Sequence, residues 1–167
     1  FTGGEDVTPK LYNHQKGAYT HCNSDRDMYE SDMFYCLPGN TPKLGICRGA
    51  QFLTVMSKGK LIQHVEGHAI SNKHNIEIIY PFKQTIDITS THHQMMYPFN
   101  LIKNEDYILC AYSTFHRSGI YLNGINENIK LPNNFVEPEI VFYPKQNALA
   151  IQGHPESSTM TKDEQLF

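Results

Sequence analysis

The stretch that decides the fold is Gly45-Ile46-Cys47-Arg48-Gly49-Ala50-Gln51. It lies between a short apolar run, which predicts a strand over Lys43–Cys47, and a helical pattern over Arg48–Met56 that ends near Gly59. The form G-x-C-x-G is the cysteine counterpart of the G-x-S-x-G turn, in which a strand bends sharply into a helix. That bend brings the residues two before and two after the cysteine together, and only glycine tolerates the approach.

The predicted turn has a chemical consequence for Cys47. A side chain at the bend lies at the helix N-terminus, where unpaired amides and the helix dipole favour the thiolate, which is the reactive form. The amide of Arg48, next along the chain, is expected to point at an oxyanion forming there. The turn taken alone is as open to a plainer interpretation, in which Cys47 is a small buried apolar residue and the glycines only shape the bend.

A second motif, Gln152-Gly153-His154-Pro155-Glu156, closes the last predicted strand. Proline restricts His154 to extended conformations, and residues two apart in an extended segment project to the same side. Glu156 can therefore reach one ring nitrogen of His154 while the other faces a thiol, which supplies a base and the group that orients it. Taken alone this motif is typical of a surface turn, so its weight comes from its pairing with Cys47.

The remaining elements predict an α/β fold. A helix is predicted over Asp25–Leu37, and Pro144-Lys145-Gln146-Asn147 is a predicted hairpin turn. Strand-like runs are Leu61–Val65, Ile76–Tyr80, Thr85–Ser90, Tyr107–Tyr112, Gly119–Leu122, Ile140–Tyr143 and Ala148–Gln152. Such strands combined with a strand–turn–helix unit indicate the α/β class.

Composition restricts the class of protein further. The 167 residues suit one domain, and a net charge of −3 with scattered basic residues argues against partners such as nucleic acid or an anionic membrane. Apolar runs are far shorter than the roughly 20 residues that a membrane helix needs. Four widely separated cysteines do not form a disulfide framework, which favours a reducing compartment and a cytoplasmic location.

Nine histidines raise the question of a metal. His64 and His68 have the spacing of a zincin helix, but Glu66 stands one place late and Gly67 weakens a helix there. His92 and His93 are adjacent, which suits two faces of one strand better than one metal. We therefore predict no metal and no cofactor, and we expect His74 and His116 to lie at the surface.

Together, the segment Gly45–Gln51 and the terminal Gly153–Glu156 resemble the class I glutamine amidotransferase superfamily, and within it the γ-glutamyl hydrolase-like branch, peptidase C26. Three further segments match motifs of that branch: Gly3–Tyr12, Asp25–Glu30 and Ser90–Gln94. The resemblance extends from residue 3 to residue 156, and the two catalytic motifs are its most specific part.

The resemblance implies a role for each matching residue. Cys47 is expected to be the nucleophile, His154 the general base and acid, and Glu156 the residue that orients His154. The other implied site residues are the oxyanion-hole amides of Gly4 and Arg48, and the substrate-binding residues Gly3, Gln51, Thr91, His92, His93 and Gln94. The reaction so implied is hydrolysis of a γ-glutamyl amide through a γ-glutamyl thioester on Cys47.

As to architecture, the resemblance implies a mostly parallel, flavodoxin-like sheet flanked by helices, in one catalytic domain over residues 1–167. The strand–helix units that begin this fold are missing from the chain, so we expect a bare sheet edge and an open apolar face. Two other functions stay open. One is a glutaminase that supplies ammonia to a synthetase domain or subunit, and the other is a non-catalytic binding protein on the same scaffold.

Overall fold

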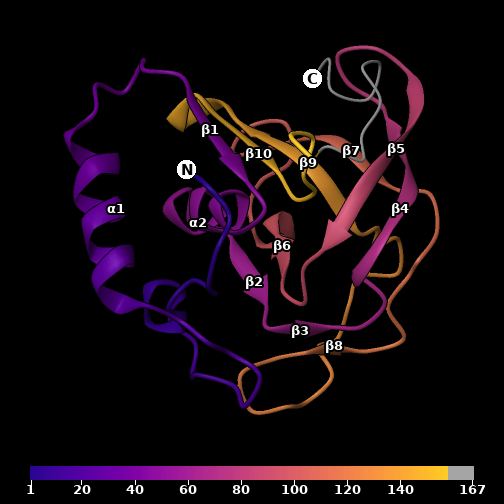
Figure 1. Ribbon diagram of the computed structural model, residues 1–167. Coiled ribbons are helices and arrows are strands. Elements are labelled where there is room, and N and C mark those ends of the chain that lie inside the picture. Colours follow the sequence, from indigo (N-terminus) through magenta and orange to yellow (C-terminus); the bar gives the residue numbers. More distant parts are fainter. Residues whose placement is uncertain (158–167) are drawn as a thin grey trace.

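The computed structural model describes residues 1–157, apart from the side chains of residues 70–72. A six-stranded sheet has the order β1-β10-β9-β7-β4-β5 (Figure 1). Its strands are β1 (Lys43–Ile46), β4 (Ala69–Ile78), β5 (Gln84–Thr91), β7 (Ile108–Ser113), β9 (Pro138–Tyr143) and β10 (Ala148–Ile151). The last ten residues of the predicted domain lie outside the described part of the chain.

Two short ribbons and two α-helices complete the fold. β2 (Lys60–Ile62) pairs with β6 (Met95–Tyr97), and β3 (His64–Val65) pairs with β8 (Tyr121–Leu122). The helices are α1 (Ser24–Cys36) and α2 (Arg48–Met56), and the 3-10 turns are η1 (Pro9–Tyr12), η2 (Pro98–Asn100) and η3 (Pro144–Gln146). None of the described helices is long and apolar enough to cross a membrane.

The α/β class is confirmed, whereas the expectation of a mostly parallel sheet is wrong for the described residues. Only β1 and β10 pair in parallel in the six-stranded sheet, and its other four pairings are antiparallel. The reason lies in the connections. β9 and β10 are joined by the predicted turn at Pro144–Asn147, and so short a loop allows only antiparallel pairing, because parallel neighbours need a crossover of about a dozen residues or more.

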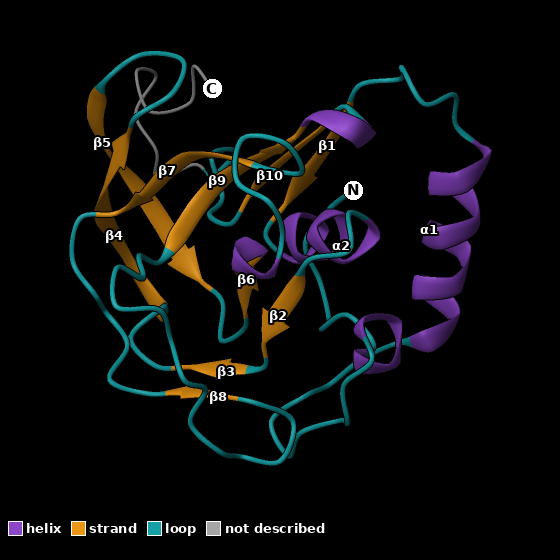
Figure 2. Cartoon of the chain, turned by 180° about the vertical axis from the view of Figure 1, so that it is seen from behind, coloured by secondary structure: helices purple, strands orange, loops and turns teal. Residues whose placement is uncertain are grey.

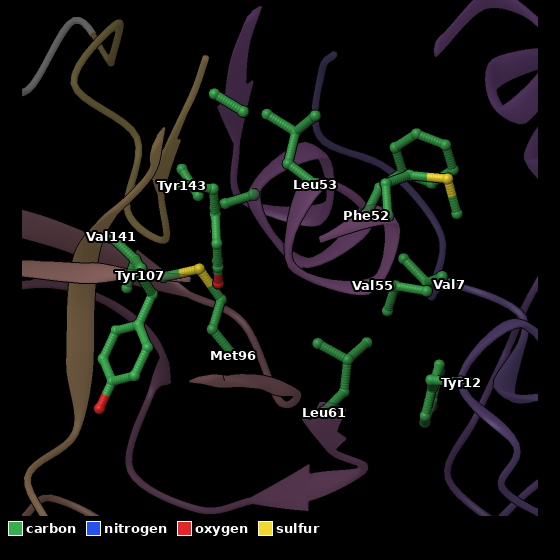
Figure 3. Packing of buried hydrophobic residues seen from close by; sticks show 14 of the residues in the cluster. Val7, Tyr12, Phe52, Leu53, Val55, Leu61, Met96, Tyr107, Val141 and Tyr143 are labelled. Carbon is green, nitrogen blue, oxygen red and sulfur yellow. The ribbon is translucent and has the colours of Figure 1, made fainter. Parts of the chain in front are cut away.

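The helix that follows Cys47, α2, packs against β1 and β10 (Figures 1 and 2). All of its residues are buried, and Phe52, Leu53 and Val55 join the main apolar cluster. Val7 and Tyr143 belong to the same cluster, which Figure 3 shows from close by. Each large apolar side chain buried here stabilises the fold by about 1.5–3 kcal/mol. The bend at Cys47 is therefore held by a helix that is fixed to the core.

Part of the sheet surface carries the expected open apolar area. A hollow of about 310 Å³ lies there, next to a second apolar cluster from β4, β5, β7, β9 and β10. Its lining residues are Ile78, Tyr80, Pro81, Cys110, Ile140, Phe142, Leu149 and Ile151. The hollow has no titratable side chain other than Tyr80 and Cys110, and burial raises the pKa of Cys110. The surface is therefore apolar and separate from the chemistry around Cys47.

Candidate functional site

The predicted strand–turn–helix at Cys47 is present, between the end of β1 and the start of α2. Cys47 itself has φ 52° and ψ −111°, a conformation that residues with a side chain seldom adopt. A Cβ atom on Gly45 would overlap the backbone of Gly49, and one on Gly49 would overlap the carbonyl of Phe1. Both glycines are thus required by close backbone approach, as the sequence pattern predicts.

The side chain of Cys47 lines a cavity of about 150 Å³. Cys47 is 8% exposed, so its thiol is accessible through this cavity and hardly from elsewhere. The cavity is lined by Gly4, Glu5, Asp6, His21, Cys47, Arg48, Gln51, Thr91, His92, His93 and Gln94. Most of the residues implied by the resemblance meet here. Glu5, Asp6 and His21 were not predicted as site residues, although Glu5 and Asp6 lie in the segment Gly3–Tyr12 that matches the family.

His154 reaches the thiol through the pairing of β1 with β10. These strands are in register, with Ile46 opposite Ile151, and the amide of Cys47 donates a 2.8 Å hydrogen bond to the Ile151 carbonyl. Three residues later, the backbone of His154 is held on both sides by the Thr89 hydroxyl, at 3.1 Å each. The ring stands next to Gly3, where a Cβ would lie 3.2 Å from His154 Cε1 and 3.8 Å from Cys47 Cβ. Nucleophile candidate and base candidate are therefore neighbours.

The protonation of His154 follows from its two partners. Its Nδ1 lies 2.7 Å from Glu156 Oε1. The predicted contact is present, but Pro155 and Glu156 form a turn, closed by a 3.1 Å hydrogen bond from the Ser157 amide to the His154 carbonyl, instead of the predicted extended segment. The hydrogen bond with the Cys47 side chain raises the pKa of His154 to about 9, burial opposes the rise, and the Glu156 carboxylate adds to it. The ring is thus held in its protonated form near neutral pH, and it faces a sulfur atom that can carry the compensating negative charge.

Two backbone amides beside the thiol can receive a negative oxygen. Arg48 is the first residue of α2, and an amide at that position has no intrahelical carbonyl to bind. Gly4 lines the same cavity with φ +145°, a conformation in which a side chain would be strained. Neither amide donates a hydrogen bond to another group among residues 1–157.

The predicted substrate-binding residues divide into two groups. Nδ1 of His92 donates to the Gln94 carbonyl at 2.8 Å, and the Gln51 side chain donates to the same oxygen at 3.0 Å. Both side chains are buried and form the wall of the cavity. His93 is different because it is partly exposed there and lies 3.0 Å from the Asp6 carboxylate, a bond that raises the pKa of His93.

A separate group of buried histidines lies behind this wall. His68 contacts Glu137 at 3.1 Å and His74 contacts Glu139 at 2.8 Å, so the prediction that His74 lies at the surface is wrong. Possible ligand atoms of His68, His92 and Glu139 lie within 4.8 Å of one another. Both ring nitrogens of His68 already have partners, the Ser90 hydroxyl at 3.0 Å and Glu137 at 3.1 Å, so His68 belongs to a buried hydrogen-bonded network.

The family model for Peptidase C26 matches residues 1–156. The chain belongs to the Peptidase C26 family. It is 30% identical over 172 residues to the glutamine amidotransferase-like protein YvdE of Lactococcus lactis, across 99% of this chain and 69% of the relative. Over 66 residues it is 44% identical to a glutamine amidotransferase-like protein of Rickettsia prowazekii, across 38% of this chain and 23% of that one.

Solved structures support the fold of this Peptidase C26 member. A glutamine amidotransferase from Thermotoga maritima superposes with a TM-score of 0.55 at 16% identity, over 84% of this chain and 54% of that one. A Thermoplasma acidophilum protein described as a GMP synthase subunit has a TM-score of 0.53 at 18% identity, over 84% and 58%. The chain therefore has the class I glutamine amidotransferase fold and spans little more than half the length of these two chains.

Proposed function

We propose that the chain hydrolyses a γ-glutamyl amide through a γ-glutamyl thioester on Cys47. The observation that carries this proposal is the contact of Cys47 with His154, whose other ring nitrogen binds Glu156. A thiol, a protonated imidazole and an orienting carboxylate are the three groups that cysteine-based acyl transfer needs. Membership of Peptidase C26 and the relatives named as glutamine amidotransferase-like support the same reaction class.

The proposed first step forms the thioester. The Cys47 sulfur attacks the γ-carbonyl carbon, and the carbonyl oxygen takes up negative charge while accepting hydrogen bonds from the Gly4 and Arg48 amides. His154 then gives its proton to the leaving nitrogen, so that the C–N bond breaks and ammonia or an amine departs. Each oxyanion donor is expected to lower the barrier by roughly 3 kcal/mol.

The second step releases the glutamyl group. His154, now neutral, removes a proton from a water molecule, and the resulting hydroxide attacks the thioester carbon. The C–S bond breaks, glutamate leaves, and the thiolate of Cys47 again faces a protonated His154. Glu156 stabilises the imidazolium in both steps, and the polar wall around His93 and Asp6 suits the charged α-groups of a glutamyl substrate.

Turnover of glutamine and a panel of γ-glutamyl amines by the full-length protein tests the proposal. Cys47→Ala is expected to lower turnover by roughly 10⁴-fold or more, because the covalent route is lost. Cys36→Ala is the matched control, since Cys36 is exposed and lies at the end of α1, and it should retain wild-type rates. Comparable turnover by Cys47→Ala and wild type would refute the mechanism.

Covalent labelling adds an independent readout. An electrophilic glutamine analogue should modify Cys47 and leave the exposed Cys36 unmodified, because only Cys47 lies in the cavity. Mass spectrometry of the digested protein locates the adduct. An adduct on Cys36 or Cys22 with Cys47 untouched would contradict the assignment.

A second candidate function is supply of ammonia to a synthetase. It is favoured by the structural similarity to the Thermoplasma acidophilum protein described as part of GMP synthase, and by the partial coverage of that chain. In that case glutaminase activity should be weak alone and rise sharply when a synthetase and its acceptor substrate are added. Equal activity on several γ-glutamyl amines without any partner would exclude it.

A further inference from the structure

The loop that contains Gly4 is fastened by one side chain from a distant helix. Nη2 of Arg26, on α1, donates to the carbonyl oxygens of Thr2 and Gly3 at 3.1 Å each. Its Nη1 donates to the Glu5 carboxylate at 3.1 Å. A Cβ on Gly4 would overlap this guanidinium group, so Arg26 fills the space beside the loop.

The bond from Arg26 to Gly3 fixes the direction of a neighbouring amide. In a trans peptide the C=O of one residue and the N–H of the next point in opposite directions. The Gly3 carbonyl is directed at Arg26, so the Gly4 N–H is directed away from it. Gly4 lines the Cys47 cavity while Arg26 does not, and the amide is therefore aimed at the side where an oxyanion forms.

The same guanidinium is linked through Glu30 to the side chain of Arg48, the residue that carries the other predicted oxyanion-hole amide. Nε of Arg26 donates to Glu30 Oε1 at 3.0 Å, and the second oxygen of Glu30 binds the side chain of Arg48. Arg48 is only 2% exposed and also binds Asp27, whose other oxygen accepts the Thr8 amide at 2.8 Å. One carboxylate thus joins the arginine that holds the Gly4 peptide to the arginine whose own amide follows Cys47.

We propose that Arg26 is a positioning residue that aims the Gly4 amide at the reacting oxygen, with Glu30 keeping the Gly4 loop in register with Arg48. This inference rests on the proposed hydrolase function. Arg26 does not itself line the cavity, but it holds the lining residues Gly4 and Glu5 from behind, so it acts through the Gly3–Gly4 peptide. Without it, that peptide loses the bond that sets its orientation, and the transition state loses one donor while the ground state loses little.

The test compares Arg26→Met with Arg117→Met in the full-length protein. Arg117 is a matched control, because its Nε also donates to a glycine carbonyl, that of Gly67, at 3.1 Å and far from Cys47 in sequence. Arg26→Met should lower kcat by roughly 10- to 100-fold and change KM by less than about threefold. Arg117→Met should leave both unchanged, and Arg26→Lys should recover part of the loss, because an ammonium can still reach a carbonyl.

Alkylation by iodoacetamide separates positioning from general damage. This reaction forms no oxyanion, so the rate at Cys47 should be the same in wild type and Arg26→Met, with Cys36 as the internal reference. A slower rate at Cys47 together with lost activity would show that the variant disturbs the thiol itself, and would overturn the inference.

The failure of this inference can be told from the failure of the proposed function. If wild type turns over no γ-glutamyl amide, the proposed function fails and the inference fails with it. If wild type is active through Cys47 and Arg26→Met keeps its kcat, only the role of Arg26 is refuted. A low kcat in Arg26→Met combined with a partly recovered one in Arg26→Lys supports the role.

Discussion

Histidine contacts glutamate in two regions of this molecule, one partly exposed at the cavity and one fully buried behind it. At the cavity, His154 contacts Glu156, both are open to solvent, and the neighbouring Cys47 raises the pKa of His154 to about 9. Behind the cavity wall, His68 contacts Glu137, and neither has any solvent exposure. His92, stacked on His68, has its pKa lowered well below the usual value, first by burial and then by the charge of His68.

The two glutamates differ in how many groups they bind. Glu137 accepts bonds from His68, from the amides of Arg117 and Ser118, and from the Tyr121 hydroxyl. Burial raises the pKa of Glu137, but the bonds from His68 and the two amides outweigh it, and the value falls to about 2. This region holds loops together, whereas at Cys47 the raised pKa of His154 keeps that ring protonated near neutral pH.

The largest expected effect is a loss of activity when the histidine at the cavity is replaced. His154→Gln should lower kcat/KM by roughly 10⁴-fold, because the proton donor is lost, and should leave the melting temperature close to that of wild type. Steady-state kinetics and thermal unfolding measure the two quantities. His116→Gln, at an exposed histidine, is the control with wild-type values expected for both. A large loss of stability in His154→Gln would place it with the buried histidines instead.

The second prediction concerns the buried region, where a substitution should lower stability and leave activity nearly unchanged. Glu137→Gln should lower the free energy of unfolding by about 3 kcal/mol, because it removes a buried charge from four donors, and should change kcat little below its melting temperature. Urea unfolding measures the first, and Glu127→Gln, at an exposed glutamate, is the control. Equal stability of Glu137→Gln and wild type would mean that this carboxylate is not a structural anchor.

The stabilisation by Glu137 should also depend on pH. Because its pKa is depressed in the folded state from 4.5 to about 2, its contribution is complete above pH 4.5 and is lost as the pH falls toward 2. Wild type should therefore lose more stability across that interval than Glu137→Gln does. Parallel curves for the two proteins would contradict the assignment.

The smallest expected effect concerns the carboxylate at the cavity. Glu156 helps to raise the pKa of His154, so Glu156→Gln should move the basic limb of the activity profile from near pH 9 to lower pH. Glu156 is more than half exposed, and since solvent screens its charge, the loss of kcat/KM near neutral pH should be about tenfold or less. An unchanged basic limb would show that Glu156 does not act on His154.

Sequence patterns predicted the features that depend on a few consecutive residues. The bend at Cys47 and the contact of His154 with Glu156 each lie within seven residues, although a turn and not an extended segment makes that contact. The helix over Asp25–Leu37 and most strands were close to the observed elements, but the strand predicted over Ile76–Tyr80 covers only the end of β4. The three-residue β6 was too short to give a periodic signal. The position of β6 depends on its pairing with β2, which no local pattern contains.

Features assembled from distant segments were missed. The buried surroundings of His74 come from Glu139, 65 residues away, and a single exposed-looking histidine gives no sign of them. The contact of Arg26 with Thr2 and Gly3 likewise spans more than 20 residues. The mostly parallel sheet was expected from the whole family fold, while the connections of this chain impose antiparallel pairing on most of its strands.

The parallel pairing of β1 with β10 also has a consequence during synthesis. Cys47 is synthesised early, but the imidazole that lies beside it arrives more than a hundred residues later, three residues after the end of β10. In the growing chain, Cys47 therefore has no imidazole beside it until β10 pairs with β1. Any reaction that needs both side chains can therefore begin only when nearly the whole described chain has been translated and folded.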